Sequence, residues 1–301
     1  MKQFTIQMLE PQGYCGGVLK AIQIAKNCRL ENQSEHITIL GNLVHNKYVQ
    51  EALQYHNIET VDVKNKSRLE LLDLIDSGIV IFTAHGVSSA VFEKARKKGL
   101  KIIDATCPFV SQTQKIVKEY LEQDFIVFYI GKKNHPEAQA IYEGNANVYL
   151  IESTQDIPSI NSSKIFVTNQ TTMSILDIQN IFDEISKKYP TCIIHDEICN
   201  ATRIRQQAIL NLKNQGIDTL IVVGDPTSNN TSQLANIGKI AGIPQVIKAQ
   251  SVNDIDLDSI KNHAHIAITS GASTPSYLTN MIYDYLNNQG EKEKIRIENI
   301  L

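Results

Sequence analysis

The chain has few cysteines, no marked excess of either charge and no long apolar run. Five of its 301 residues are cysteine, and 29 Lys and Arg stand against 32 Asp and Glu, a formal net charge of −3. This near balance, with no basic block, argues against a nucleic-acid-binding protein. The longest apolar runs, FIVFYI and TLIVVG, are too short to cross a bilayer. The start, MKQFTIQMLEPQG, is typical of a strand and not of a signal peptide. We therefore expect a soluble, cytoplasmic protein with no nucleic-acid or membrane partner.

The cysteine count is odd as well as low. In a reducing compartment such a count argues against a disulfide framework and favours metal or redox chemistry. Cys28 lies inside a helical pattern and Cys192 lies in the strand-like run CIIHD, so both fit ordinary core positions.

The other three cysteines are evenly spaced. Cys15, Cys107 and Cys199 lie 92 residues apart (107 − 15 and 199 − 107), each before a helical pattern: GYCGGVLKAI, DATCPFVSQT and DEICNATRIR. Three thiolates can hold a metal but leave one position open, which favours catalysis over a structural role. Zinc is one candidate, although the short spacings of zinc ribbons are absent. An iron–sulfur cluster with one open iron is the other.

Short β-branched runs alternate with amphipathic stretches along the chain. Such alternation predicts α/β units with parallel sheets, whose ligands bind at the carboxyl ends of the strands. The predicted buried strands are HITILGN, GIVIFTA, KIIDAT, FIVFYIG, KIFVTN, CIIHDE, TLIVVGD and HIAITSG. The predicted helices between them include RLELLDLIDSG, SAVFEKARKKG, SILDIQNIFDEISKKY and RIRQQAILNLKNQG.

The period extends to two polar loops that follow each cysteine. The first loops are GNLVHN, GKKNHPEA and GDPTSNNT, and the second are FTAHGVSS, VTNQTTMS and ITSGASTPS. A period of this length suits a small domain and not a solenoid repeat. We predict three similar α/β repeats at 15–98, 99–192 and 193–282, with an N-terminal strand in 1–14 and a tail, 283–301, packing on the body. Pseudo-threefold packing would point the cysteines and loops at one centre.

These loops carry side chains that can bind an anion. Histidine and neutral donors can hold phosphate oxygens, and glycines let the backbone approach closely. The candidates are His45, His85, His135, Thr171, Ser228, Asn229, Asn230 and Ser273. As a set they indicate a pocket for a small phosphorylated ligand, although each loop alone also fits ordinary turn chemistry. Glu137, in NHPEA, is either a proton-transfer group or a first-turn acid that favours the helix dipole.

The ordered motifs GYCGGV, GNLVHN, TAHGVS, DATCP, NHPEA, NQTT, DEICNAT, TSNNT and SGAS resemble the 4-hydroxy-3-methylbut-2-enyl diphosphate reductase family. This family catalyses the last step of the non-mevalonate isoprenoid pathway. The resemblance runs from about residue 5 to about residue 282. It implies a trefoil-like arrangement of three α/β domains around one central [4Fe–4S] cluster per chain.

The resemblance also implies a role for each matching residue. Cys15, Cys107 and Cys199 match the cluster ligands, and Glu137 matches the proton-transfer residue. The substrate-contacting positions match His45, His85, His135, Thr171, Ser228, Asn230 and Ser273. The family often has Ser-Ser-Asn where this chain has Ser228-Asn229-Asn230, and Asn229 can still donate through its side chain or backbone.

The implied reaction is a reductive dehydroxylation of an allylic diphosphate. The substrate hydroxyl would meet the open iron, and Glu137, with Thr171 and His135 nearby, would deliver a proton to the leaving hydroxide. Protonation at either end of the allyl group gives isopentenyl or dimethylallyl diphosphate. The resemblance implies a ferredoxin or flavodoxin as electron donor, in a small and transient encounter.

Two other functions stay open. One is a non-redox hydro-lyase whose cluster is only a Lewis acid, and dependence on a reductant separates it from the reductase. The other is a zinc-stabilised phosphometabolite-binding protein. A measurement of the metal content, zinc or iron, separates it from the two cluster enzymes.

Overall fold

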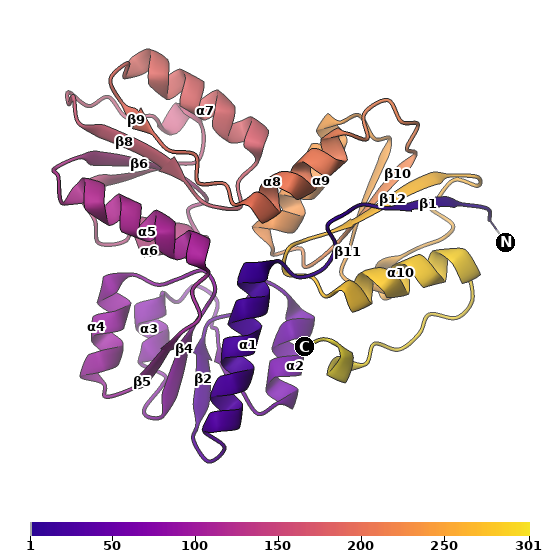
Figure 1. Ribbon diagram of the computed structural model, residues 1–301, viewed down its shortest axis with the longest axis horizontal. Helices are drawn as coiled ribbons and strands as arrows, with labels where there is room; N and C mark the ends of the chain where they lie inside the picture. The colour runs from indigo at the N-terminus through magenta and orange to yellow at the C-terminus, as the bar shows by residue number, and fades with distance from the viewer. Residues whose placement is uncertain (1) are drawn as a thin grey trace. The chain divides into compact units, whose positions relative to one another are not determined.

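The computed structural model describes residues 2–301, and its strands form three parallel four-stranded sheets (Figure 1). The predicted α/β class with parallel sheets is confirmed. The chain forms two compact units. Unit 1 holds the N-terminal segment through Leu19, His45–Tyr55 and Asn200–Leu301, and unit 2 holds Lys20–Val44 and His56–Cys199. The boundaries of the three repeats and their pseudo-threefold arrangement stay predictions.

The first sheet of unit 2 has the order β3-β2-β4-β5. Its central strands β2 (Ile37–Leu40) and β4 (Ile79–Phe82) are buried at every residue, because helices cover both faces of a parallel sheet. The flanking strands are β3 (Glu59–Val61) and β5 (Lys101–Asp104). The helices of this part are α3 (Arg68–Leu72), α4 (Ser89–Lys97) and α1 (Gly16–Glu31), which begins in unit 1.

The second sheet of unit 2 has the order β7-β6-β8-β9. Its strands are β6 (Ile126–Ile130), β7 (Val148–Ile151), β8 (Ile165–Asn169) and β9 (Ile193–Ile194). Alternate residues of β6 serve two cores, because side chains of a strand point to opposite faces in turn. Val127 and Tyr129 pack on the side of α5 (Pro108–Leu121) and α6 (Pro136–Tyr142), whereas Phe128 and Ile130 pack on the side of α7 (Ile175–Lys188) (Figure 1). A short 3-10 helix, η1 (Thr154–Asp156), follows β7.

Unit 1 contains the third sheet, with the order β1-β12-β10-β11. Its strands are β10 (Thr219–Val223), β11 (Gln245–Ala249), β12 (His265–Ser270) and β1 (Thr5–Met8). The indigo strand β1 lies beside the yellow strand β12 in Figure 1, and Thr5 pairs with His265. The helices are α2 (Lys47–Tyr55), α8 (Asn200–Leu210), α9 (Asn229–Ile240) and α10 (Ser276–Asn288), with the 3-10 helices η2 (Val252–Asp254) and η3 (Ile297–Asn299).

All three sheets share one strand order. From one edge they run β3-β2-β4-β5, β7-β6-β8-β9 and β11-β10-β12-β1, so the N-terminal strand takes the place that β5 and β9 hold in the other two sheets. The N-terminal segment is therefore part of the third sheet and does more than pack against it. Each of these fourth strands leads along the chain to one of the evenly spaced cysteines.

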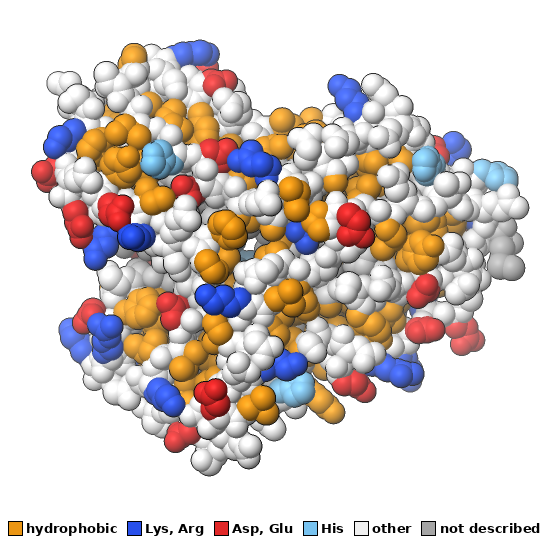
Figure 2. Space-filling view, viewed as in Figure 1, with side chains coloured by type: hydrophobic (Ala, Val, Ile, Leu, Met, Phe, Trp, Pro, Cys, Tyr) orange, Lys and Arg blue, Asp and Glu red, His pale blue; other side chains and the backbone are white. Residues whose placement is uncertain are grey.

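Charges of both signs are interspersed on the face of the molecule shown in Figure 2. Helix α5, for example, pairs Lys115 with Glu119 and Lys118 with Glu122, each at 3.7 Å. Among residues 2–301, no helix combines the length and the apolar character needed to cross a membrane.

Candidate active site

The three evenly spaced cysteines have the same backbone anchor in all three sheets. The N–H of Cys15 donates to the Ala272 carbonyl at 2.9 Å. The N–H groups of Cys107 and Cys199 donate to the carbonyls of Ala84 and Thr171, at 3.0 and 3.1 Å. Every acceptor lies two residues after the third strand of its sheet, β12, β4 or β8. The regular sequence spacing therefore corresponds to one repeated structural position.

The donor set suits an iron–sulfur group. None of the five cysteines in the described chain forms a disulfide, and Cys15, Cys107 and Cys199 are each half-buried. Burial raises the pKa of the Cys28 thiol and of the Cys192 thiol, which disfavours their thiolate forms. The three cysteines that share one backbone anchor are the sulfur donors that fit, because they occupy equivalent positions of the three sheets.

The first polar loops also repeat one structure. Each begins with a glycine whose N–H donates to the last residue of the edge strand: Gly41 to Val61, Gly131 to Ile151 and Gly224 to Ala249. Four residues beyond each glycine lies a predicted anion-binding residue: His45, His135 or Ser228. These side chains therefore occupy one position of the repeat, after the carboxyl end of the second strand of each sheet, β2, β6 or β10.

His135 and Glu137 occupy the start of helix α6. His135 is the N-cap residue, and its Nδ1 accepts the Glu137 N–H at 3.2 Å. An Nδ1 that accepts leaves Nε2 to carry the proton of the neutral ring. The His135 ring lies perpendicular to the His85 ring, with centroids 5.4 Å apart. Unit 2 thus brings together two histidines that belong to different polar loops.

Glu137 is a buried carboxyl group held by Thr171. The side chain is 2% exposed, and its oxygens accept the Thr171 N–H at 2.7 Å and the Thr171 hydroxyl at 3.0 Å. Burial raises the pKa of Glu137 to about 7, although both bonds from Thr171 act to lower it. A carboxyl group with such a pKa can hold and release a proton near neutral pH.

Thr171 connects this carboxyl group to a cysteine. Its N–H and hydroxyl donate to Glu137, and its carbonyl accepts the Cys199 N–H. By the backbone anchor, Thr171 is the counterpart of Ala84 and Ala272, so Thr172 and not Thr171 matches the position of His85 and Ser273. Of the three residues that accept a cysteine N–H, only Thr171 has a hydroxyl group. It follows β8 of the same sheet whose strand β6 leads to Glu137 in α6.

Unit 1 links the other predicted residues through hydrogen bonds. Ser228 is the N-cap residue of α9, and its Oγ accepts the Thr231 N–H at 3.3 Å. The Asn230 side chain accepts the Ala272 N–H at 3.0 Å and donates to the Thr202 hydroxyl at 3.2 Å, which leaves one amide hydrogen for a ligand. The Ser273 hydroxyl donates to the His45 carbonyl at 3.1 Å.

Asn229 stands between Ser228 and Asn230, where the first polar loop of the third sheet enters α9. It is the first residue of α9 and is half-buried. Its backbone N–H lies in the first turn of α9, and the N-terminal end of a helix favours a bound anion.

Two polar residues that the sequence did not single out hold the loops in place. Asp225 is 6% exposed, and its carboxylate accepts from the Thr227 hydroxyl at 2.6 Å and from the Lys47 N–H at 3.0 Å. Gln170 accepts the Lys132 N–H and donates to the Thr172 hydroxyl, both at 3.0 Å, so it joins the two polar loops of the second sheet. The Asp-Pro-Thr turn was a usable signal for Asp225.

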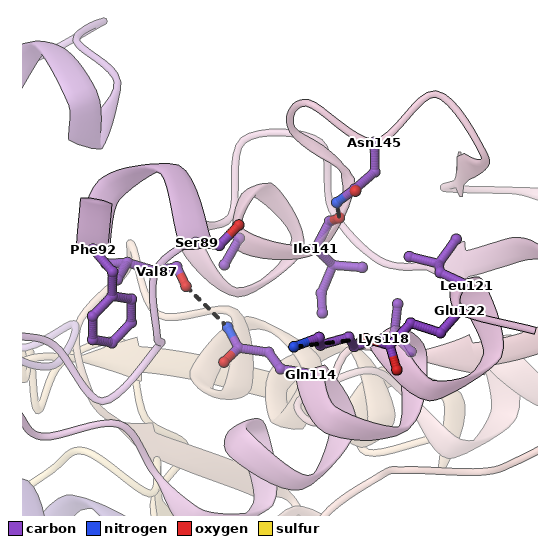
Figure 3. Close-up of a pocket in the computed structure, with 11 residues that line it drawn as sticks. Val87, Ser89, Phe92, Gln114, Lys118, Leu121, Glu122, Ile141 and Asn145 are labelled. Carbon is purple, nitrogen blue, oxygen red and sulfur yellow. Dashed lines mark hydrogen bonds and ion pairs between the residues drawn. The ribbon is translucent and has the colours of Figure 1, made fainter. Parts of the chain in front are cut away.

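A cavity of about 590 Å³ also lies in unit 2, beside α4, α5 and α6. Val87, Phe92, Gln114, Lys118 and Ile141 are among the residues that line it (Figure 3). The Gln114 side chain points to the Val87 carbonyl at 3.5 Å and lies over Gly86, next to His85. No predicted site residue lines this cavity.

A family model described as LytB protein matches residues 6–287, most of the chain. The chain belongs to the LytB protein family. A relative from Anoxybacillus flavithermus (strain DSM 21510 / WK1), named 4-hydroxy-3-methylbut-2-enyl diphosphate reductase, is 44% identical over 282 residues, which cover 92% of this chain and 89% of the relative. A relative of the same name from Geobacillus sp. (strain WCH70) is 41% identical over 305 residues, covering 97% and 96%. The family resemblance of the sequence motifs is therefore confirmed.

Solved structures agree with this membership. The E-1-hydroxy-2-methyl-but-2-enyl-4-diphosphate reductase from Plasmodium falciparum matches with a TM-score of 0.87 at 29% identity, covering 97% of this chain and 95% of that one. A second structure, titled (E)-4-hydroxy-3-methyl-but-2-enyl diphosphate reductase, matches with a TM-score of 0.64 at 26% identity, covering 96% and 100%.

Proposed function

We propose that this chain is a 4-hydroxy-3-methylbut-2-enyl diphosphate reductase, an oxidoreductase of non-mevalonate isoprenoid biosynthesis. The observation that carries the proposal is the repeated backbone anchor of Cys15, Cys107 and Cys199 in a chain of the LytB family. The reaction consumes two electrons and two protons, breaks the bond between carbon and the hydroxyl oxygen, and releases water with isopentenyl or dimethylallyl diphosphate. The predicted pathway function is supported by relatives of that name.

Cys15, Cys107 and Cys199 would hold one [4Fe–4S] cluster per chain. Their three thiolates match the three-cysteine ligand set, while burial raises the pKa of the Cys28 and Cys192 thiols and so disfavours their ligand forms. When bound, the cluster supplies the electrons and a Lewis-acidic open iron for the substrate hydroxyl.

The polar loops would bind the diphosphate. In unit 2, His85 and His135 present two rings that can donate N–H groups to phosphate oxygens, and protonated rings add charge. In unit 1, Ser228, Asn229 and Asn230 offer neutral donors, and His45 follows the same glycine-led turn as His135. Ser273 would bind the diphosphate by turning its hydroxyl from the His45 carbonyl to a phosphate oxygen. Binding at the non-reacting diphosphate would orient the hydroxyl and the allyl group for reaction.

Glu137 would deliver the proton to the leaving hydroxide. Its pKa near 7 allows a substantial protonated fraction at neutral pH, and the two bonds from Thr171 fix both carboxyl oxygens. Because Thr171 also accepts the Cys199 N–H, the position of the acid is tied to the backbone of a proposed ligand. A ferredoxin or flavodoxin would supply the electrons, one at a time.

The first experiment is an anaerobic iron and sulfide analysis of reconstituted protein, followed by turnover assays with and without a reductant. Nearly four irons and four sulfides per chain are expected, with product formed only when a reductant is present. If the cluster-loaded protein dehydrates the substrate without a reductant, the protein is a hydro-lyase and not a reductase. Zinc, or no metal, in a folded protein that still binds the diphosphate would indicate the binding protein instead.

A further inference from the structure

The segment between β1 and α1 carries Cys15 and is held along its length in unit 1. Leu9 donates its N–H to the Ile268 carbonyl at 2.9 Å, and Gly13 donates to the Ser270 hydroxyl at 3.0 Å. Cys15 then donates to Ala272, as described above. Gly13 has a φ of +75°, and a side chain there would press on Ser276, with Cβ atoms 3.3 Å apart. The turn before Cys15 therefore has one tightly defined backbone path.

A buried guanidinium group completes this turn. Arg205 of α8 is 2% exposed, and it donates to the Gly13 carbonyl at 2.8 Å and to the Ala201 carbonyl at 3.0 Å. Burying a charged group is costly unless hydrogen bonds compensate for the lost water. An arginine on the exposed face of α8 would avoid that cost. The burial of Arg205 therefore indicates that its hydrogen bond to the Gly13 carbonyl, two residues before Cys15, matters for this part of the chain.

The need for this contact follows from the length of the segment. Counting from the last backbone–backbone hydrogen bond to the neighbouring strand, Cys15 is six positions away (Leu9), Cys199 is four (His195) and Cys107 is two (Ala105). In two of the segments a side chain of that strand also holds the residue two before the cysteine: Ser270 accepts the Gly13 N–H, and Asn169 accepts the Glu197 N–H. A longer connection has more conformations available, and fixing it costs more entropy. The Cys15 segment is the longest of the three to fix, and Arg205 adds a contact at the Gly13 carbonyl to the bond that the Gly13 N–H makes with Ser270.

We propose that Arg205 is a positioning residue for Cys15. By holding the Gly13 carbonyl against α8, it presents the Cys15 thiol in one orientation for metal binding. The inference rests on the proposed function, since it concerns a cysteine assigned there as a ligand. Helix α8 begins at Asn200, directly after Cys199, so the residue that positions one proposed ligand is carried by the helix that follows another.

Hydrogen exchange of the metal-free protein tests this directly, with Arg205→Met as the variant. Arg203→Met is the matched control, because Arg203 is an exposed arginine of the same helix and loses the same charge. In Arg205→Met, the peptide covering residues 9–19 should exchange about 10- to 100-fold faster, the range expected for losing a hydrogen bond from a charged donor. The peptides of β10 and β12 should keep their wild-type rates.

Two results would overturn the proposal. Wild-type exchange of residues 9–19 in Arg205→Met would show that the contact does not hold the segment. Equal acceleration in β10 and β12 would show that Arg205 only stabilises unit 1 as a whole. Should Arg205→Met fail to fold, Arg205→Lys serves instead, since one ammonium cannot reproduce both bonds of the guanidinium geometry and should give a smaller acceleration confined to residues 9–19.

The metal-loaded protein provides a second readout besides activity. Iron release to a chelator should be faster in Arg205→Met than in wild type and unchanged in Arg203→Met. Equal release from all three proteins contradicts the positioning role. A wild-type protein that takes up no iron overturns the proposed function, whereas the exchange experiment still reports on the contact between Arg205 and Gly13.

Discussion

Replacing Thr171 with valine tests whether Glu137 transfers the proton. The change removes the hydroxyl that donates to one carboxyl oxygen at 3.0 Å and leaves the backbone N–H that donates to the other at 2.7 Å. Valine keeps nearly the same shape, and both residues are buried, at 4% and 2% exposed, so water does not readily replace the hydroxyl. The variant therefore isolates one hydrogen bond to the acid.

The magnitude follows from the strength of that bond. A hydrogen bond to a charged group contributes about 1.5–3 kcal/mol, and one pKa unit corresponds to about 1.4 kcal/mol. Because the Thr171 hydroxyl favours the ionised carboxylate, its loss should raise the pKa of Glu137 above its present value of about 7, by about one to two units. An acid with a higher pKa keeps its proton to higher pH.

The assay is the pH profile of kcat/KM, with Thr113→Val as the control. Thr113 is a buried threonine of unit 2 whose hydroxyl donates to the Phe109 carbonyl and not to Glu137. In Thr171→Val, the alkaline limb of the profile should move to higher pH by about one to two pH units. In Thr113→Val it should stay at the wild-type pH. An unmoved limb in Thr171→Val, or the same shift in both variants, would refute the assignment of Glu137 as the acid.

Three other predictions concern stability and metal binding. Burial raises the pKa of Glu137 from 4.5 to about 7, so its stabilising effect is complete below pH 4.5 and is lost as the pH rises through 7, by about 3 kcal/mol in all. Glu137→Gln should remove this decline in urea unfolding at several pH values and lose most turnover, and an unchanged decline would contradict the buried acid. Cys107→Ser should abolish iron binding while Cys192→Ala retains it, as iron analysis would show; iron loss in Cys192→Ala would mean that the wrong thiols were chosen. Gly224→Ala would place a Cβ 2.4 Å from the Thr231 hydroxyl and 2.9 Å from the Thr274 hydroxyl, and should cost about 1–3 kcal/mol in thermal unfolding. Adding Thr231→Ala should restore part of this loss, because it removes the shorter contact and leaves that with Thr274; no restoration would exclude the Thr231 clash as the cause.

The sequence predicted the central strands well because burial on both faces leaves a continuous apolar run. The strands β2, β4, β6, β8, β10 and β12 all coincide with predicted runs. The edge strands β3, β7 and β11 were not predicted; unlike the central strands, each is partly exposed along its length. The helical pattern RIRQQAILNLKNQG extends to residue 216, but α8 ends at Leu210, where turns begin.

The candidate site was predictable only where the repeat marked it. Equal spacing singled out Cys15, Cys107 and Cys199, and the structure gives them one backbone anchor. Spacing could not reveal the partners of these residues. Arg205 and Gly13 are 192 positions apart, and nothing in either local sequence indicates that they meet. Such contacts depend on which helix packs beside which turn, and only the folded chain defines that.

The position of β1 in the third sheet has a consequence for how the chain folds during synthesis. The strands of the first two sheets leave the ribosome one after another, so each sheet can close from neighbouring segments. Strand β1 is made first but pairs with β12, with Thr5 opposite His265. Pairing between such distant segments is slow, because the entropy of closing a long loop is lost before the stabilising contacts form. We therefore expect the third sheet, and with it the anchor of Cys15, to be completed last.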